Sequence, residues 1–594
     1  MNRRSFLQLS ALSLAAQALH AQAPVSGVCS PVLKRSYDLA NTGCNLAETK
    51  LTPAYVKSNG VRVLGTLQMA GDARGAEAQP LVVPSVMMPD GFAHDLIVVA
   101  DMAGSIWCWD GSTFALLWMQ HLANPIKGTA AIDSWGINDF WCFLSTPVVD
   151  PTTNILYAVG WQSPDGTAAK AMHYFHAINL KDGSRNQPPI NLAAAYRPAS
   201  GPLQLYSATL RKQRSSLTLA TIAGKKTVLW CAGTVAETSA IASGWIFAYD
   251  IPSGQITART FSDTNYGCGV WMAGASPSVD TRGNIYVVTG NGTFDGASSF
   301  GECAVKLSYT PPGTSAGSFT IVDWYCPYTD QQREGTAIVD ETKIAGVNGP
   351  TSKMAMAVNY AGYNDQDLGS AQGCLIESLG LFLVTGKDGI CYPVNMHNMG
   401  KTTLAQLAAG QQYAALAFPP IYLTYFPGWD VSPDPLNPVA LDVAGFTRHN
   451  HSTPVQYLSP VHGQMMFVAG ENSPVRAFQI TATGLTFLAQ SNETASAQVT
   501  NPPGGMPGMQ MTLAASSAGA ILICSAPYGN ANQTVTNGRL LIYDAENFAG
   551  GVMQLLWDSQ AEGIPYHYNK FGSLVVSGGK ILLPTYDDRT LILG

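Results

Sequence analysis

The chain is poor in charged residues, and its basic residues do not cluster. Of its 594 residues only 12% are charged, and the formal net charge is −7. A nucleic-acid interface needs Lys and Arg side chains gathered against phosphates, so this composition argues against nucleic acid as a partner. The same shortage of basic clusters argues against binding to an anionic membrane surface.

The chain also lacks paired cysteine motifs and long apolar runs. Its 11 cysteines occur singly, without a C-x-x-C, a C-x-x-C-H or an adjacent pair. This excludes zinc ribbons, thioredoxin-like redox sites and c-type haem attachment. Cys108, Cys231 and Cys524 lie within apolar strand patterns and are expected to be small core residues. Because no stretch reaches the apolar length that a membrane-spanning helix needs, we expect no transmembrane segment.

The first residues of the chain have the pattern of an export signal. Arg3 and Arg4 precede Phe6 and Leu7 and a short apolar stretch, and a small-residue cleavage pattern ends at Ala23. This pattern is typical of a twin-arginine signal peptide over residues 1–23. We therefore expect the protein to be periplasmic or secreted.

Residues 24–594 carry a degenerate repeat of apolar strands and polar turns. Each copy has an apolar strand, a turn that often contains Asp and Gly, and a second strand, as in SIWCWDGSTFALLW from Ser105 and WIFAYDIPSGQITAR from Trp245. Several copies follow another strand pair, such as STPVVDPTTNILYAVG. Repeated four-stranded antiparallel units are typical of a β-propeller, whose radial packing covers both faces of each unit. We predict one all-β domain, an eight-bladed β-propeller, whose last blade is closed by the C-terminal strands and an N-terminal strand near VRVLGTLQMA.

The repeats resemble those of a known superfamily. Turns of the form Y/F-A-Y-D…G are similar to those of the pyrroloquinoline-quinone-like (PQQ-like) propellers, which include the quinoprotein alcohol dehydrogenases and the outer-membrane assembly scaffold BamB. Exported bacterial PQQ-like propellers are matched more closely, by SYDLANTGCNLAETKLTP, STPVVDPTTNILYAV, GVWMAGASPSVDTRGNIYVVTGNGTFD, LVTGKDGICYPVNMHNMG and HNHSTPV. These matches extend over nearly all of residues 24–594. The resemblance implies the propeller fold and leaves the function open.

The segments that lead into the first strand of each blade form a candidate site. In a propeller these strands surround the central channel, so the preceding residues, here named feeder segments, lie around one axial mouth. Seven feeder segments are found, at residues 133–149, 210–220, 267–279, 364–376, 447–457, 504–514 and 566–576. Six of them bring charged, imidazole or aromatic side chains to the mouth: Asp139, Arg214, Trp271, Asp367, His449, His451, His567 and Lys570. Convergent polar groups around a pocket favour a ligand site, although propeller mouths are also polar by default.

Several of these side chains have both a structural and a functional interpretation. Trp271 could stack on a planar cofactor or plug the top of the channel. His449 and His451 could bind a metal ion, or they could cap backbone carbonyls, and the sequence predicts no third Cys or His ligand.

Two functions from different classes follow. In the first, which we favour, the mouth is a scaffold that binds a small molecule, a glycan or a protein partner. In the second, the protein is an oxidoreductase of the PQQ- and Ca²⁺-dependent alcohol dehydrogenase type, for which the resemblance supports only the scaffold. There Asp139 or Asp367 would accept a substrate proton and Arg214 or Lys570 would polarise a quinone oxygen, with Trp271 and His567 beside the quinone. The adjacent-cysteine pair typical of the alcohol dehydrogenases is absent, as is a haem motif.

Overall fold

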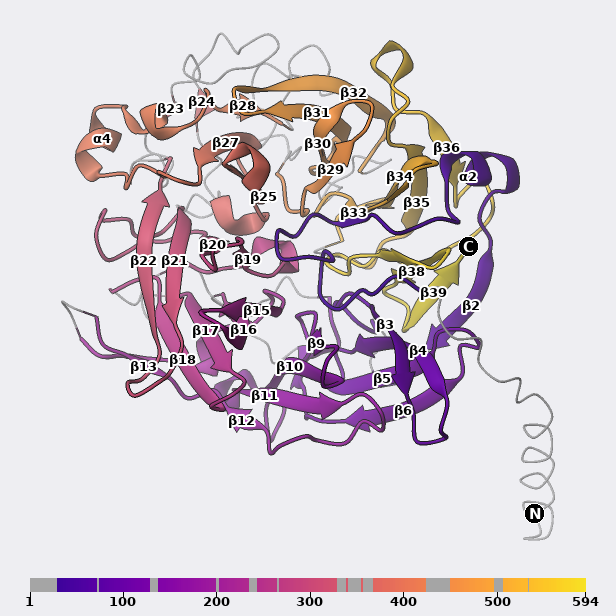
Figure 1. The fold of residues 1–594 in the computed structure, drawn as a ribbon, viewed down its shortest axis with the longest axis horizontal. Coiled ribbons are helices and arrows are strands. Elements are labelled where there is room, and N and C mark those ends of the chain that lie inside the picture. Colours follow the sequence, from indigo (N-terminus) through magenta and orange to yellow (C-terminus); the bar gives the residue numbers. More distant parts are fainter. Residues whose placement is uncertain are drawn as a thin grey trace.

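Eight β-sheets are arranged around a central axis (Figure 1). The computed structural model describes residues 29–71, 74–128, 137–198, 202–233, 243–263, 267–327, 367–423, 449–495, 506–531 and 534–594, with two short strands at 338–339 and 354–355. The signal peptide expected over residues 1–23 lies outside this range. The predicted eight-bladed propeller of four-stranded antiparallel blades is confirmed.

Blades 1 to 4 are meanders whose four strands follow chain order outward from the axis. Blade 1 contains β3 (Leu81–Met87), β4 (Ala93–Ala100), β5 (Ser105–Asp110) and β6 (Leu116–His121). Blade 2 contains β9 (Val148–Asp150), β10 (Ile155–Gln162), β11 (Met172–Asn179) and β12 (Ile190–Asn191). Blade 3 contains β15 (Thr218–Ile222), β16 (Lys225–Ala232), β17 (Trp245–Asp250) and β18 (Gln255–Thr260). Blade 4 contains β19 (Ser278–Val279), β20 (Ile285–Val288), β21 (Ala304–Thr310) and β22 (Ser318–Tyr325).

Blades 5 to 7 repeat this order, and blade 7 has one added strand. Blade 5 contains β25 (Cys374–Ile376), β26 (Leu381–Thr385), β27 (Ile390–Asn395) and β28 (Ile421–Tyr422). Blade 6 contains β29 (Val455–Ser459), β30 (Gly463–Val468), β31 (Pro474–Thr481) and β32 (Gly484–Thr494). Blade 7 contains β33 (Gln510–Ser516), β34 (Gly519–Pro527), β35 (Gly538–Asp544) and β36 (Leu555–Asp558), and β1 (Cys44–Asn45) pairs in parallel with β33.

Blade 8 joins the two ends of the chain. Its inner strands are β37 (Val575–Ser577), β38 (Lys580–Pro584) and β39 (Arg589–Leu593), and β2 (Val63–Gln68) pairs antiparallel with β39. The closing N-terminal strand predicted near residues 61–70 is therefore confirmed. Closure of the ring removes the sheet edges that an open meander would expose.

The remaining elements are short. Two-residue strand pairs are β7 (Ile126–Lys127) with β8 (Phe140–Trp141), β13 (Ala195–Tyr196) with β14 (Gln204–Leu205), and β23 (Ile338–Val339) with β24 (Met354–Ala355). Among the described residues, the α-helices are α2 (Pro53–Asn59) and α4 (Leu404–Ala408). Single 3₁₀ turns are η2 (Ala168–Lys170), η3 (Ala208–Leu210), η4 (Met272–Gly274), η6 (Leu368–Ser370), η7 (Glu377–Leu379), η8 (Gln412–Ala415) and η9 (Ala549–Gly551). Within the described ranges, no helix is both long and apolar enough to cross a membrane.

The Asp that recurs in the repeat ends the third strand of a blade and caps the turn that follows. Asp110 ends β5, and its Oδ1 accepts the backbone N–H groups of Ser112 and Thr113 at 3.0 and 2.6 Å. Asp544 ends β35 and accepts two N–H groups in the same way. A short acidic side chain can satisfy the turn backbone in this manner, which explains why the repeat places Asp here.

Apolar side chains fill the spaces between the blades. Between blades 2 and 3, the ring of Trp230 lies between those of Phe175 and Phe247, with ring centroids 5.2 and 5.3 Å away. Ten of the eleven cysteines are buried, including Cys108 and Cys524. The prediction that these cysteines are core residues is therefore confirmed.

Residues 32–45, here named the channel segment, run through the centre of the ring (Figure 1, indigo). The innermost strands would otherwise present unpaired N–H and C=O groups to the axis. The carbonyls of Leu33, Leu39, Thr42 and Gly43 accept hydrogen bonds of 2.9, 2.9, 2.9 and 3.0 Å from the N–H groups of Val149, Val279, Gln456 and Leu513 in four of these strands. The channel segment thus ties together inner strands of blades that are distant in the sequence. The sequence had indicated only the closing strand β2 from this end of the chain.

Candidate functional site

One axial mouth is built from two kinds of segment. The feeder segments lie at the start of the innermost strands, and the turns between second and third strands lie at the same end because neighbouring strands are antiparallel. Neighbouring feeder segments contact each other around the axis. The backbone N–H of Thr146 donates to Ser216 at 3.0 Å, Ser370 donates to the carbonyl of Asn450 at 2.8 Å, and Tyr568 donates to that of Gly508 at 2.7 Å.

A buried carboxylate, Glu77, lies in the segment before β3 and forms the centre of a polar cluster. Its Oε2 forms an ion pair with Arg214, and its Oε1 accepts the Tyr586 hydroxyl and the Asn138 amide, the latter at 2.9 Å. Glu77 is fully buried, and Arg214 is only 6% exposed. The ion pair therefore lies in a poorly solvated position, where both charges depend on their partners.

Further cations lie around this pair. Arg35, from the channel segment, donates to the backbone carbonyls of Phe571 and Ala273 at 2.9 and 2.8 Å and so connects two feeder segments. Lys212 and Lys570 are buried beside the indole of Trp141, with ammonium-to-centroid distances of 3.9 and 5.6 Å. We name Glu77 with Arg35, Lys212, Arg214 and Lys570 the cation cluster.

The charges of the cation cluster influence one another. Burial opposes ionisation of Glu77, but Arg214 and Lys570 together with its hydrogen bonds outweigh that effect and lower its pKa to about 2. Burial also lowers the pKa of Arg35, and the positive charge of Arg214 lowers it further. Glu77 is therefore held ionised, and the two guanidinium groups lie close enough to repel each other.

Aromatic rings lie next to these cations. The guanidinium of Arg214 stacks over the half-buried ring of Phe571 at 4.1 Å from its centroid. Trp271 is also half-buried, and its ring packs on the backbone of Gly233, where an added Cβ would be 2.7 Å from the indole. Gly233 donates its N–H to the carbonyl of Lys212 at 2.9 Å, so Trp271 lies beside the cation cluster.

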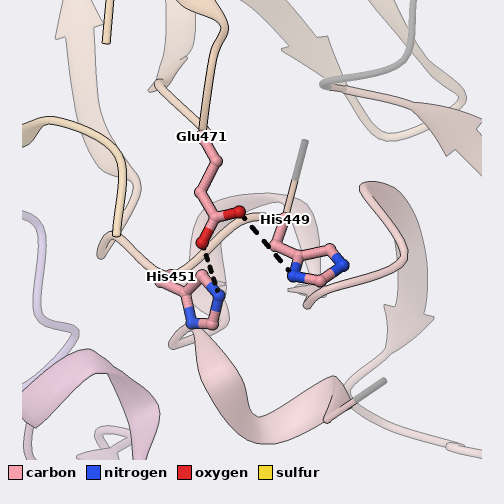
Figure 2. A group of neighbouring side chains, drawn as sticks. All are labelled: His449, His451 and Glu471. Atoms are coloured by element: carbon pink, nitrogen blue, oxygen red, sulfur yellow. Dashed lines mark ion pairs between the residues drawn. The ribbon is translucent and has the colours of Figure 1, made fainter. Parts of the chain in front are cut away.

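A second group of side chains comes from blade 6. His449 and His451 precede β29, and Glu471 lies in the turn between β30 and β31. Figure 2 shows the Glu471 carboxylate between the two imidazoles, with Oε2 3.8 Å from His449 Nδ1 and Oε1 3.1 Å from His451 Nε2. One ligand atom from each of the three residues lies within 4.8 Å of the other two. The structure thus places beside the two histidines a third side chain of metal-binding type, Glu471, that the sequence did not predict.

Asp367 has both carboxylate oxygens engaged. It is 2% exposed, its Oδ2 forms an ion pair with Lys387 at 2.8 Å, and its Oδ1 accepts the N–H of Asn291 at 2.8 Å. These contacts hold the turns of blades 4 and 5 to the feeder segment that precedes β25.

Asp139 and His567 lie at the exposed part of the mouth. Asp139 is paired with Arg74 at 3.8 Å, and its side chain is 44% exposed. His567 is exposed, and its carbonyl accepts the N–H of Tyr586 at 2.9 Å.

The eight side chains predicted for the mouth thus fall into three sets. Arg214, Trp271 and Lys570 lie together at the cation cluster, and His449 and His451 form a second group. Asp139, His567 and Asp367 each lie in separate surroundings.

A hollow of about 320 Å³ also lies between blades 1 and 2 at this end of the strands. It is lined by His121, Leu122, Asn124, Gln162, Ser163 and Met172. This lining has no carboxylate, Lys or Arg, so the hollow differs in chemistry from both groups described above.

Comparison with known proteins gives a likeness in fold. No model of a protein family and no curated protein matches the chain. Solved structures similar to it include the quinohemoprotein alcohol dehydrogenase ADHIIG of Pseudomonas putida HK5, with 10% identity, 89% of this chain and 72% of that chain covered, and a TM-score of 0.49. The quinohemoprotein alcohol dehydrogenase of Comamonas testosteroni has 11% identity, the same two coverages of 89% and 72%, and a TM-score of 0.47.

BamB from Moraxella catarrhalis is a further similar structure, with 11% identity, 90% of this chain and 97% of that chain covered, and a TM-score of 0.39. Identities this low say nothing of ligand or activity. The resemblance predicted from the sequence is confirmed in fold: this chain is an eight-bladed propeller, and the solved structures similar to it include quinohemoprotein alcohol dehydrogenases and BamB.

Proposed function

We propose that residues 24–594 form one exported binding domain whose axial mouth takes a small anionic ligand. The observation that carries this proposal is the cation cluster, in which Arg214 forms an ion pair with Glu77 and the guanidinium of Arg35 lies close enough for the charges of both residues to influence it. Guanidinium groups suit carboxylates and phosphates because they offer several N–H donors in a planar fork. Like charges held in a poorly solvated mouth also raise the local concentration of an oppositely charged ligand.

The rings beside the cluster favour a ligand that is planar as well as anionic. Trp271 and Phe571 are half-buried, so each leaves part of its ring accessible. Among the described residues, the buried indole N–H groups of Trp141 and Trp271 have no hydrogen-bond acceptor. A bound ligand with acidic oxygens would supply acceptors at this place and would meet an aromatic surface suited to stacking.

The oxidoreductase alternative is only partly compatible with these residues. A quinone that bears carboxylates fits the cation cluster, where Arg35, Arg214 and Lys570 would face its acidic groups. Calcium does not fit, because it takes six to eight oxygen ligands. Glu77 and Asp367 are already engaged with cations, and the group of three adjacent metal-binding side chains found in the described residues contains two imidazoles. We therefore derive no catalytic step and favour binding.

Ligand binding is tested with PQQ and citrate as probes, since both carry several carboxylates and only PQQ is planar. Arg214→Gln should weaken the binding of both probes about 10- to 100-fold, which corresponds to about 1.4 to 2.8 kcal/mol. Phe571→Leu should weaken PQQ binding more than citrate binding, because it removes a ring and no charge. Isothermal titration calorimetry gives both affinities, and thermal melting shows whether each variant is folded.

The matched control is Arg282→Gln, because Arg282 is exposed in the turn between β19 and β20 at the opposite end of the strands. This variant should bind both probes as the unaltered protein does. Absence of binding by the unaltered protein, or equal losses for Arg214→Gln and Arg282→Gln, would contradict the proposal. Oxidation of an alcohol with reduction of a dye by the PQQ-loaded protein would instead favour the oxidoreductase.

Export is the part of the proposal that depends on residues 1–23. Replacement of both Arg3 and Arg4 by Lys should leave the precursor in the cytoplasm, because a twin-arginine signal is read through this pair. Cell fractionation with antibody detection measures the outcome. Unchanged accumulation outside the inner membrane would show that another export route is used.

A further inference from the structure

We infer that His449, His451 and Glu471 form a binding site for a first-row divalent transition metal, with Zn²⁺ as the representative ion. The site goes beyond the anionic ligand proposed above and uses none of the residues of the cation cluster. Two imidazole nitrogens and one carboxylate oxygen are the protein ligand set of many zinc sites that keep a position open for a further ligand.

The distances between the ligand atoms suit one shared ion. Zinc bonds to imidazole nitrogen and carboxylate oxygen are about 2.0 to 2.2 Å long, so two ligand atoms around a tetrahedral ion lie roughly 3.3 to 3.6 Å apart. Here the carboxylate oxygens of Glu471 are 3.1 Å from His451 Nε2 and 3.8 Å from His449 Nδ1. These two distances involve different oxygens of Glu471. One ligand atom from each of the three residues lies within 4.8 Å of the other two, so the separations would have to shrink by about one ångström or slightly more to surround one ion, a displacement within the reach of side-chain rotation.

The backbone around the site is held in place by its neighbours. The N–H of Glu471 donates to the carbonyl of His449 at 2.9 Å, which fixes the turn between β30 and β31 against the feeder segment. On one side of His451, the backbone N–H of Asn450 donates to the carbonyl of Gly386 at 3.2 Å. On the other, the hydroxyl of Ser452 donates to the carbonyl of Ala469 at 2.9 Å. The metal ligands are therefore carried by backbone that is anchored on both sides, which lowers the cost of assembling the site.

The ligand chemistry selects among ions. Imidazole is a ligand of intermediate softness that suits Zn²⁺, Cu²⁺, Ni²⁺ and Fe²⁺, whereas Ca²⁺ and Mg²⁺ prefer oxygen. His451 and Glu471 are buried and His449 is half-buried, so the ion would be bound at the mouth with one side toward solvent. A transition metal here would distinguish this propeller from one that uses calcium.

Metal binding is tested on the folded, full-length mature protein after dialysis against a chelator. Calorimetric titration with Zn²⁺ should show one ion per chain, and Co²⁺ should give the visible absorption bands of a four- or five-coordinate ion. His451→Ala and Glu471→Gln should each weaken Zn²⁺ binding by at least about 100-fold, because loss of a ligand costs at least as much as loss of a group that orients one. Zn²⁺ should raise the melting temperature of the unaltered protein but not that of these two variants.

Two controls make the result specific. His397→Ala removes an exposed imidazole after β27 and should leave Zn²⁺ affinity unchanged. Arg214→Gln should also leave it unchanged, so that failure of the metal site and failure of the proposed anion site can be told apart. The inference would be overturned by absence of Zn²⁺ binding, by Zn²⁺ binding that survives both ligand substitutions, or by Ca²⁺ binding of equal affinity at the same three residues.

Discussion

Replacing Glu77 with Gln should lower the free energy of unfolding by about 3 to 5 kcal/mol, the usual effect of removing one member of a buried ion pair. Gln keeps the size of the side chain and can still accept from Asn138. It cannot balance the charge of Arg214, which is 6% exposed. The cost arises because this guanidinium would remain buried without the carboxylate with which it forms an ion pair. Denaturant unfolding followed by circular dichroism measures it.

Asp139→Asn is the matched control for this prediction. It also neutralises a carboxylate at the mouth, but that carboxylate is exposed and 3.8 Å from Arg74. Exposed ion pairs contribute little, so the change should be below about 1 kcal/mol. If Glu77→Gln costs no more than Asp139→Asn, the cation cluster does not depend on Glu77.

The pH dependence of stability provides a second measurement on the same carboxylate. The pKa of Glu77 is lowered from its usual value near 4.5 to about 2 in the folded protein. Between these two values the unfolded chain binds more protons than the folded chain, so acid favours unfolding. The stabilisation by Glu77 is complete above pH 4.5 and is lost as the pH falls toward 2. The difference in stability between the unaltered protein and Glu77→Gln should therefore narrow over this range.

The fold could be predicted because its signals are local and repeated. The Asp that ends β5 and β35 caps its own turn, so the same short pattern marks a blade wherever it occurs. The closing strand β2 was also predictable, since an unpaired last strand at β39 needs a partner from the other end of the chain. The channel segment was not predictable, because it forms no blade of its own and its hydrogen bonds join residues hundreds of positions apart.

The candidate site was predictable in part. Feeder segments precede inner strands, and this rule alone led to Arg214, Lys570, His449 and His451. Glu77 was missed because the segment before β3 was not counted as a feeder segment, although GAEAQP precedes an apolar strand there. Glu471 was missed because it follows a second strand. In an antiparallel meander, the turn after the second strand lies at the same end of the blade as the start of the first strand. The letters GEN, directly after the strand letters MMFVA, were therefore the sequence signal that could have placed Glu471 at the mouth.

Asn41→Leu should lower the free energy of unfolding by about 3 to 5 kcal/mol, because it breaks the polar contacts that hold the channel segment in the ring. Asn41 is 2% exposed. Its Oδ1 accepts from the Lys34 ammonium at 2.6 Å and the Ser276 hydroxyl at 2.9 Å, and its Nδ2 donates to the Ser276 carbonyl and the Ser278 hydroxyl at 2.9 Å each. Leu would remove all four bonds. The Lys34 ammonium would keep the carbonyls of Arg35 and Asp38, and the Ser276 carbonyl and Ser278 hydroxyl would keep the Gln372 amide, so each lost bond costs about 0.5 to 1.5 kcal/mol.

The backbone conformation of Asn41 adds a separate part to the cost of Asn41→Leu. A second Asn with a similar backbone conformation allows this part to be measured alone. Asn41 has a φ of 57°, in the left-handed region that Asn tolerates better than Leu. Asn154, in the turn between β9 and β10, has a φ of 55° and is half-buried. Asn154→Leu should therefore cost only the backbone strain, about 1 to 2 kcal/mol. The excess loss for Asn41→Leu in denaturant unfolding measures what the buried hydrogen bonds contribute, and equal losses for the two variants would mean that the side-chain hydrogen bonds of Asn41 contribute nothing to stability.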